Sequence, residues 1–317
     1  MASLQDAGRH SFRNIGIGSA GAMDYFALMV SNFLVGNDET AAAIEISFPA
    51  PEILFQQNAI ISLTGADFSA TINDTALPLW RPFFAKKDAV LKFNQPVYGS
   101  KTYLAVHGGW KGEKWLGSYS THLKVGAGGY LGRALQKDDI ILCKENNFFP
   151  AENKILNWHI SENELNKIYL PTNTIRCIKG AEWDLLDEAS KQNFEKTDLT
   201  IINQSDRMGY RLIGTSLSLK QPTEIISSAV DGGTVQLLPD GNLIVLMADH
   251  QTTGGYPRIA SVIKADLPKF AQLNPTQKIS FSIITLQEAE DALISMMQTL
   301  TEIKNGCHLN FEKYFQS

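Results

Sequence analysis

The sequence predicts a mainly β protein with a few helices, an α+β fold arranged as two β-rich, barrel-like units. Between residues 42 and 143, short apolar runs are separated by turn residues, without the regularly intervening helices that a parallel α/β sheet requires. A second series of such runs extends from residue 174 to residue 284. Each half also contains a glycine-rich segment, so the two halves follow a similar course.

The clearest helical pattern in the first half covers residues 23 to 35. Tyr25, Phe26 and Phe33 are among its large apolar residues, which recur at helical spacing. Asp24 lies in the first turn and Gly36 follows the last one, which are typical positions for an acidic residue and a glycine at helix ends. This pattern predicts one helix among the strands.

A polar segment separates the two halves. The stretch from Glu145 to Leu170 mixes Asn, Glu and Lys with few apolar residues, as is typical of a boundary. We therefore expect an N-terminal domain at 1–150, a connecting segment at 151–170 and a C-terminal domain at 171–317. Residues 286 to 303 have helical periodicity and predict a C-terminal helix with an exposed face.

Charge and cysteine content exclude several classes of protein. The net charge is −5, and no run of Lys or Arg could follow a nucleic-acid backbone. The apolar runs are short and interrupted, so neither a membrane span nor a signal peptide is expected, and the protein is predicted to be cytoplasmic. The three cysteines lie far apart, which argues against disulfides and a metal site.

The most distinctive polar stretch of the chain is residues 246 to 259, LMADHQTTGGYPRI. It follows the apolar run 243–247, which reads as a buried strand, and its two glycines and Pro257 interrupt regular pairing. Many polar groups on a bent backbone at the end of a strand are what a small-molecule site needs. A polar hairpin turn between two strands is the alternative.

Several blocks, taken together, resemble the allophanate hydrolase subunit 2 family of carboxyltransferase-like proteins, which includes the C subunit of bacterial 5-oxoprolinase and the Kip-type antagonist of a kinase inhibitor. The matching blocks are SLQDAGR (3–9), SAGAMDYFALMVSNFLVGN (19–37), LTGADFSATIN (63–73), YLAVHGG (103–109), GSYSTHLKVGAGGYLGRAL (117–135), SDRMGYRLIG (205–214) and the 246–259 stretch extended to residue 267. They cover nearly the whole chain in family order. Family members carry a further strand before the first block, so the resemblance leaves the first strand of the N-terminal sheet in question.

The resemblance implies two cyclophilin-like β-barrel units and a stable complex with the smaller B subunit. It further implies that the chain acts as the C subunit of an ATP-dependent 5-oxoprolinase, which opens 5-oxo-L-proline to L-glutamate together with the A and B subunits, with ATP and Mg²⁺ in the complex. Two alternatives stay open: a component of a biotin-dependent carboxyltransferase, and a regulator that binds a Kip-type inhibitor without doing chemistry.

Under this resemblance the polar stretch supplies the reacting groups. Carboxylate, amide and hydroxyl side chains could orient a lactam and a phosphoryl group, and glycine amides could bind an anion. The expected catalytic residues are Asp249, Gln251 and Thr252, and the expected substrate-binding residues are Thr253, Gly254, Gly255, Tyr256, Arg207 and Arg211. The alternative is that Asp249 and Thr252 only cap the turn by accepting nearby backbone hydrogen bonds.

Arginines in two other blocks are weaker candidates. Arg207 and Arg211 could clamp an anionic group, but a buried structural ion pair, with Asp206 or Glu45 as the partner, is an equal alternative for these arginines. Gly128 and Gly129, followed by Arg133, could cradle a phosphate through backbone amides. Tight turns at the rim of a barrel are the alternative for this segment.

Overall fold

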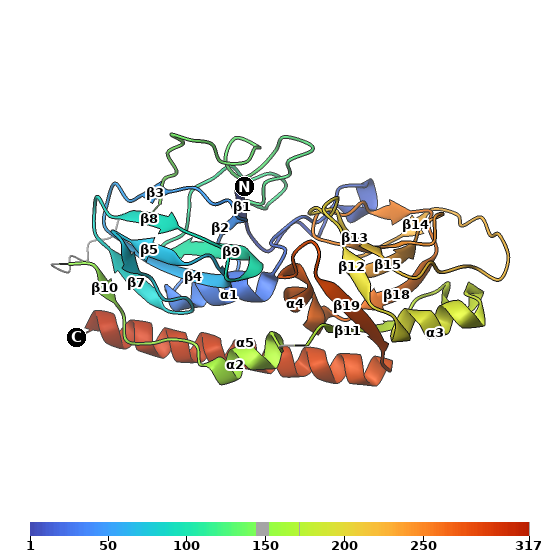
Figure 1. Ribbon diagram of the computed structural model, residues 1–317. Coiled ribbons are helices and arrows are strands. Elements are labelled where there is room, and N and C mark those ends of the chain that lie inside the picture. Colours follow the sequence, from blue (N-terminus) through green and yellow to red (C-terminus); the bar gives the residue numbers. More distant parts are fainter. Residues whose placement is uncertain (144–151, 171, 317) are drawn as a thin grey trace. The chain divides into compact units, whose positions relative to one another are not determined.

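The chain forms two compact units in the computed structural model, which describes residues 1–143, 152–170 and 172–316 (Figure 1). Unit 1 comprises residues 1–9, 20–165 and 298–317, and unit 2 comprises residues 10–19 and 166–297. Compared with the predicted domains, unit 1 also takes the C-terminal segment and unit 2 takes residues 10–19. The predicted boundary region lies partly outside the described residues, from 144 to 151.

Unit 1 is built on two sheets. The larger is antiparallel, in the order β1-β2-β9-β4-β7-β10, and the smaller has the order β3-β8-β5-β6 (Figure 1). The strands of the larger sheet are β1 (Ala2–Gln5), β2 (Ala43–Ile46), β4 (Ala59–Asp67), β7 (Pro82–Ala85), β9 (Tyr98–Val106) and β10 (Lys154–Ile155). Those of the smaller are β3 (Ile53–Leu54), β5 (Ala70–Ile72), β6 (Thr75–Ala76) and β8 (Val90–Phe93). The first strand, which the resemblance left in question, is present and pairs with β2 from Ala2↔Ile46 to Gln5↔Ala43.

Helix α1 (Tyr25–Leu34) corresponds to the helix predicted over residues 23 to 35. Asp24 caps its first turn by accepting a hydrogen bond from the Ala27 backbone N–H at 2.9 Å. The helix lies against β4, where the Thr64 hydroxyl donates to the Ala27 carbonyl at 2.7 Å and the Ser62 hydroxyl donates to the Ser31 carbonyl at 2.6 Å. Its buried positions explain why apolar residues recur at helical spacing.

The glycine-rich segment after β9 forms no long strand, and a buried carboxylate anchors part of it. Buried Asp6, just after β1, accepts hydrogen bonds from the Ser118 and Ser120 hydroxyls, both at 2.6 Å, and from the Tyr119 backbone N–H at 2.6 Å. It also accepts one from the Gly8 backbone N–H at 2.8 Å. The expected long loop is therefore packed and hydrogen-bonded to unit 1.

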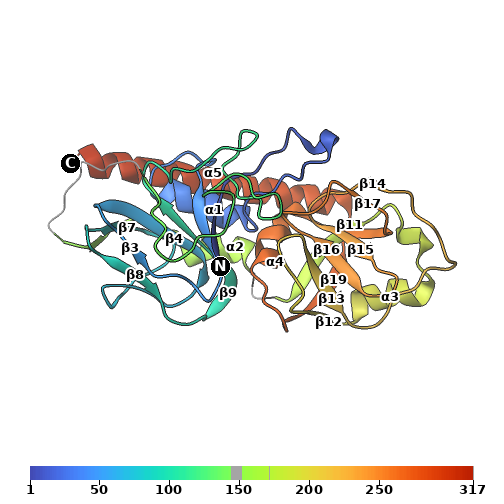
Figure 2. The ribbon, with the colours of Figure 1, turned by 90° about the horizontal axis from the view of Figure 1, so that it is seen from above.

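Unit 2 contains a closed seven-stranded barrel in the order β11-β18-β15-β16-β13-β12-β19 (Figure 2). Its strands are β11 (Thr174–Lys179), β12 (Leu199–Ile201), β13 (Gly209–Ile213), β15 (Thr234–Leu237), β16 (Leu243–Leu246), β18 (Arg258–Val262) and β19 (Lys278–Ile283). All pairs are antiparallel except β11 with β19. The short strands β14 (Ser228–Ala229) and β17 (Thr253–Gly254) pair separately.

The prediction of two barrels is confirmed only for unit 2. The described strands of unit 1 form two separate sheets instead of one closed barrel. An open sheet and a barrel give the same pattern of short apolar runs in the sequence. A barrel closes when its two edge strands pair, and the residue pattern within one strand does not show which strands pair. The coarser prediction of a mainly β fold with helices is confirmed.

The remaining helices are mostly short. They are η1 (Arg13–Ile15), α2 (Glu162–Ile168), η2 (Trp183–Leu185), α3 (Glu188–Lys196), η3 (Lys264–Asp266) and α4 (Leu267–Ala271). In unit 2, α3 places Phe194 in a stack on Phe281 of β19, with ring centroids 4.8 Å apart. Both rings of this stack are buried in unit 2.

The C-terminal helix α5 (Leu286–Gln316) is longer than the predicted 286–303. Gly306 lowers helix propensity beyond that point, which hid the continuation in the sequence. Tertiary packing within unit 1 offsets this cost: Cys307 is buried, and Phe311 lies 6.1 Å from Trp158 and 5.0 Å from His107, centroid to centroid. A Cβ on Gly36 would lie 2.8 Å from the Phe311 ring, so this contact requires glycine there.

Candidate functional site

The stretch predicted to carry the site leaves the barrel at the end of β16. Residues 247 to 252 form a loop, Thr253 and Gly254 form β17, and β18 begins at Arg258. The loop is hydrogen-bonded to the segment before β13: the Asp249 backbone N–H donates to the Arg207 carbonyl at 2.8 Å. The Met247 N–H likewise donates to the Met208 carbonyl at 3.0 Å. Two blocks far apart in the sequence thus meet.

A bidentate ion pair joins the same two blocks. Arg207 Nε donates to Asp249 Oδ2 at 2.8 Å and Nη2 donates to Oδ1 at 3.0 Å, and the two side chains are only 6% and 10% exposed. The buried ion pair considered as the alternative is therefore present at Arg207, with Asp249 as a partner. Asp206 instead accepts hydrogen bonds from the Met208 and Gly209 N–H groups of its own turn.

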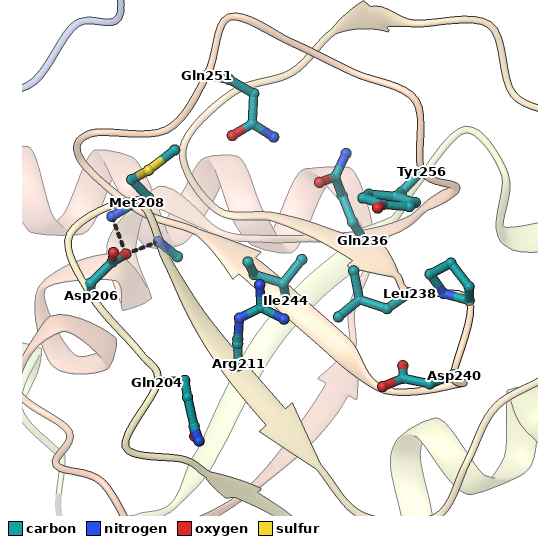
Figure 3. A pocket seen from close by; sticks show the side chains of 12 residues that line it. Gln204, Asp206, Met208, Arg211, Gln236, Leu238, Asp240, Ile244, Gln251 and Tyr256 are labelled. Carbon is teal, nitrogen blue, oxygen red and sulfur yellow. Dashed lines mark hydrogen bonds between the residues drawn. The ribbon is translucent and has the colours of Figure 1, made fainter. Parts of the chain in front are cut away.

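A cavity of about 540 Å³ opens beside this ion pair, lined by residues of β13, β15 and β16 and of the loops next to them (Figure 3). It is of the size of a small-molecule site. Its lining residues are Gln204, Asp206, Met208, Gly209, Arg211, Gln236, Leu238, Pro239, Asp240, Ile244, Gln251 and Tyr256. The cavity thus brings together three of the predicted site residues, Arg211, Gln251 and Tyr256.

The other predicted residues of this stretch support the cavity without lining it. Asp249 and Arg207 are occupied by each other, and the Thr252 carbonyl accepts a hydrogen bond from the Val230 N–H at 3.1 Å. Thr253 and Gly254 pair with β14, and Gly255 follows them. Their roles in binding or catalysis stay predictions.

The cavity wall contains a buried amide that sequence reasoning missed. Gln236 of β15 is 1% exposed, yet neither its Oε1 nor its Nε2 has a hydrogen-bond partner among the described residues. Leaving such a group unpaired in the interior costs on the order of 1–3 kcal/mol. In the view of Figure 3 its amide projects between the side chains of Gln251 and Tyr256. The available signal was a single Gln inside the apolar run TVQLLP.

Arg211 supplies the cationic side chain of the cavity. It is exposed, and within the described part of the chain its guanidinium makes no hydrogen bond or ion pair. Its charge contributes to lowering the pKa of Asp240, after the larger effects of hydrogen bonds from Asn242. Because Asp206 and Asp240 are both engaged in turns, Arg211 is the group of this cavity that is available to an anionic ligand.

The weak phosphate-binding candidates belong to unit 1. The Gly129 N–H donates to the Glu113 carbonyl at 3.0 Å, and a Cβ on Gly128 would lie 2.5 Å from the Ser120 carbonyl oxygen. Arg133 forms a bidentate ion pair with Asp139. The hydrogen bonds from Arg133 are the main cause that lowers the pKa of Asp139 to about 2. The geometry is that of packed tight turns, and phosphate binding by this segment stays a prediction.

A buried histidine lies next to Asp249 and gives unit 2 a predicted pH dependence. His250 is 2% exposed and its Nδ1–H donates to the Gln251 carbonyl at 2.6 Å. Burial lowers its pKa, against smaller opposing effects of the Gln251 carbonyl and Asp231. His250 therefore binds a proton at a higher pH in the unfolded chain than in the folded protein. As the pH falls through about 6.5, proton binding to the unfolded chain lowers the free energy of unfolding.

We expect the free energy of unfolding to fall more steeply between about pH 7.5 and pH 5.5 in the wild type than in a His250→Gln variant, because glutamine does not titrate. Urea denaturation at several pH values measures both slopes. His308→Gln, on the exposed face of α5, serves as the control and should keep the wild-type slope. Parallel slopes for wild type and His250→Gln would contradict the expectation.

Comparison with known proteins places this fold and site in a class. The chain belongs to the family of the carboxyltransferase domain, subdomain A and B, whose model matches residues 15–283. It is 37% identical over 289 residues to the C subunit of 5-oxoprolinase from Haemophilus influenzae, covering 91% of this chain and 90% of that protein. It is 40% identical over 292 residues to the C subunit of 5-oxoprolinase from Escherichia coli, covering 90% and 89%. The resemblance seen in the sequence is confirmed.

Solved structures agree with the family. The crystal structure of the K. lactis urea amidolyase matches with a TM-score of 0.85 and 25% identity, covering 95% of this chain and 19% of that one. The K. lactis urea carboxylase matches with a TM-score of 0.86 at 25% identity, covering 96% and 28%. This chain therefore corresponds to one part of those larger proteins.

Two further findings concern the described residues alone. In residues 1–143, 152–170 and 172–316, no three His, Cys, Asp or Glu side chains are grouped so that they could hold a metal ion. None of the helices in this part of the chain combines the length and apolarity needed to cross a membrane.

Proposed function

We propose that this chain serves as the C subunit of an ATP-dependent 5-oxoprolinase. The observation that carries the proposal is the identity of 37% and 40% to the C subunits of two 5-oxoprolinases, over about nine tenths of each chain. Such coverage is too large to be confined to one of the two compact units. The expectation drawn from the sequence is thereby supported in its reaction class, that of an ATP-dependent hydrolase complex.

The reaction would open a five-membered lactam, an amide whose carbonyl water attacks only slowly. ATP, with Mg²⁺, would activate that carbonyl within the assembled complex. The residues of this chain would bind and orient the lactam. Arg211 would pair with the carboxylate of 5-oxoproline, Gln251 would hydrogen-bond its polar edge, and Tyr256 would cover the ring.

Asp249, predicted from the sequence to be catalytic, would have a positioning role in this proposal. Its carboxylate is held by Arg207, so it would position the 247–252 loop that carries Gln251. Thr252, Thr253, Gly254 and Gly255 would hold the same loop against β14. These residues would thus act on the substrate through the loop that they hold in place.

The proposal also includes the partner subunits of this chain and the fold of each of its two units. The A and B subunits would assemble with this chain in the cytoplasm, and both units would be cyclophilin-like, unit 2 as the closed barrel. The naming of the two relatives as subunits supports an assembly of several chains. The domain ranges 1–150 and 171–317, joined by 151–170, stay part of the proposal.

Reconstitution tests the function. The purified A and B subunits are combined with this chain, and phosphate release from ATP is measured with and without 5-oxoproline. We expect release that depends on 5-oxoproline and on the presence of this chain. No stimulation with all three components present would refute the proposal. A chain that instead binds a Kip-type inhibitor would bind its target without stimulating ATP hydrolysis.

A second candidate function rests on the structural likeness to urea amidolyase and urea carboxylase, with TM-scores of 0.85 and 0.86. Under this candidate the chain would transfer a carboxyl group from carboxybiotin to an amide-containing substrate, which regenerates biotin. The same reconstituted mixture distinguishes the two. A carboxyltransferase would require bicarbonate and would be inhibited by avidin, whereas the proposed oxoprolinase would show neither property.

A further inference from the structure

The fold makes room for the Gln236 amide without supplying it with hydrogen-bond partners. The register between β15 and β18 shifts between Val235 and Gln236, a bulge of the kind that redirects a side chain. On the neighbouring β17, a Cβ at Gly254 would lie 2.5 Å from Gln236 Nε2. A strand irregularity and a glycine thus accommodate an amide whose donor and acceptor remain unpaired among the described residues.

We propose that the Gln236 amide recognises the cis amide edge of a lactam and so determines the substrate class of this cavity. This inference rests on the proposed function. A primary amide presents an N–H donor beside a C=O acceptor. Its complement must present an acceptor beside a donor on one edge. The ring of a lactam holds its N–H and C=O on the same side, whereas the usual trans peptide bond places them on opposite sides.

The charges around the cavity fit the rest of a 5-oxoproline molecule. Arg211 is the cationic lining residue, and the acidic lining residues Asp206 and Asp240 already accept hydrogen bonds within their own turns. A ligand with an amide edge for Gln236 and a carboxylate for Arg211 would therefore use both available groups. A neutral lactam without the carboxylate would use only one of them.

Adenine is the competing ligand chemistry, since its edge also places a donor beside an acceptor and glutamine can bind it with two hydrogen bonds. ATP takes part in the proposed reaction, so the experiment must separate the two sources. The lactam assignment predicts that changing Gln236 affects the KM for 5-oxoproline. An adenine assignment predicts an effect on the KM for ATP.

The test uses the reconstituted complex with wild-type chain, Gln236→Leu and Gln236→Met. We expect the KM for 5-oxoproline to rise about tenfold or more in both variants, because one or two hydrogen bonds to the substrate are lost, while the KM for ATP stays within about twofold. An unchanged KM for 5-oxoproline, or a rise confined to the KM for ATP, would overturn the inference. Gln221→Leu, an exposed glutamine of unit 2 outside the cavity, is the matched control.

A substrate analogue tests whether Gln236 recognises the N–H group of the lactam. N-methyl-5-oxoproline keeps the carboxylate and the carbonyl but lacks the N–H donor. Wild-type complex should bind it at least about tenfold more weakly than 5-oxoproline, and Gln236→Leu should reduce this difference to within about twofold. The same discrimination in wild type and variant would assign the recognition to another residue.

The melting temperature distinguishes a role of Gln236 in substrate binding from a role in folding, because the two roles predict changes of opposite sign. Since leucine replaces an unpaired amide, the melting temperature of Gln236→Leu should equal or exceed that of the wild type. A fall of several degrees in both Leu and Met variants would show that the amide serves folding, and would overturn the inference. If the wild-type complex turns over 5-oxoproline but the variants keep its KM, only this inference fails, whereas absence of wild-type turnover refutes the proposed function.

Discussion

Replacing Asp249 by alanine is expected to destabilise unit 2 by about 3–5 kcal/mol, because it removes the carboxylate that forms a buried, bidentate ion pair with Arg207. Both side chains are at most 10% exposed, so water cannot replace the lost hydrogen bonds without opening the structure. Urea denaturation measures the loss. Hydrogen exchange resolved by peptide should place it in residues 204–213 and 246–259, which the pair holds together.

Two controls separate this effect from a general loss of charge. Glu188→Ala removes an exposed ion pair with Lys191 and should leave the free energy of unfolding close to that of the wild type. The double variant Asp249→Leu with Arg207→Met removes both charges and should recover much of the stability lost in Asp249→Ala. A loss below about 1 kcal/mol in Asp249→Ala would show that the pair does not hold the loop. Lost activity in this variant therefore identifies a catalytic role only if the protein remains folded.

Asp6→Ala is expected to destabilise unit 1 by about 3 kcal/mol or more, because it removes the acceptor of four hydrogen bonds at once. The donors are the hydroxyls of Ser118 and Ser120 and the backbone N–H groups of Tyr119 and Gly8. Leaving a buried donor without a partner costs about 1–3 kcal/mol, and these costs are only partly additive. Urea denaturation measures the total, and faster hydrogen exchange at residues 118–121 should accompany it.

Asp67→Ala is the matched control in the same unit. Asp67 is partly buried, and its carboxylate accepts a single hydrogen bond from the Ser69 N–H at 2.7 Å, so its removal should cost about 1 kcal/mol. Equal losses for the two variants would contradict the assignment of Asp6 as the anchor of the glycine-rich segment.

Local patterns in the sequence predicted those elements whose residues carry their own signal. Helix α1 was found because its apolar spacing and its Asp24 cap are both local. The end of α5 was missed because Gly306 disfavours helix locally. The contacts of Phe311 that stabilise this end are with His107 and Trp158, more than a hundred positions away in the sequence. Closure of one barrel and not of two depends likewise on distant strand pairing.

The candidate site divides in the same way. The composition of the 246–259 stretch predicted a polar loop after a strand, and Gln251 and Tyr256 do line a cavity. The pairing of Arg207 with Asp249 could not be predicted from the sequence, because Asp206 and Glu45 also carry carboxylates. Only the hydrogen bonds between the two loops bring Asp249 within 2.8 Å.

By itself the sequence determined the family, the mainly β character, the first helix and the polar loop, since each of these depends on residue types in a local order. The tertiary structure alone decided that Asp249 is held by Arg207 and that Gln236 is a buried, unpaired amide in a cavity wall. The physical reason is that burial and hydrogen-bond satisfaction belong to a residue's surroundings. Those surroundings are built by strands distant in sequence, which the neighbours of Gln236 in the chain do not reveal.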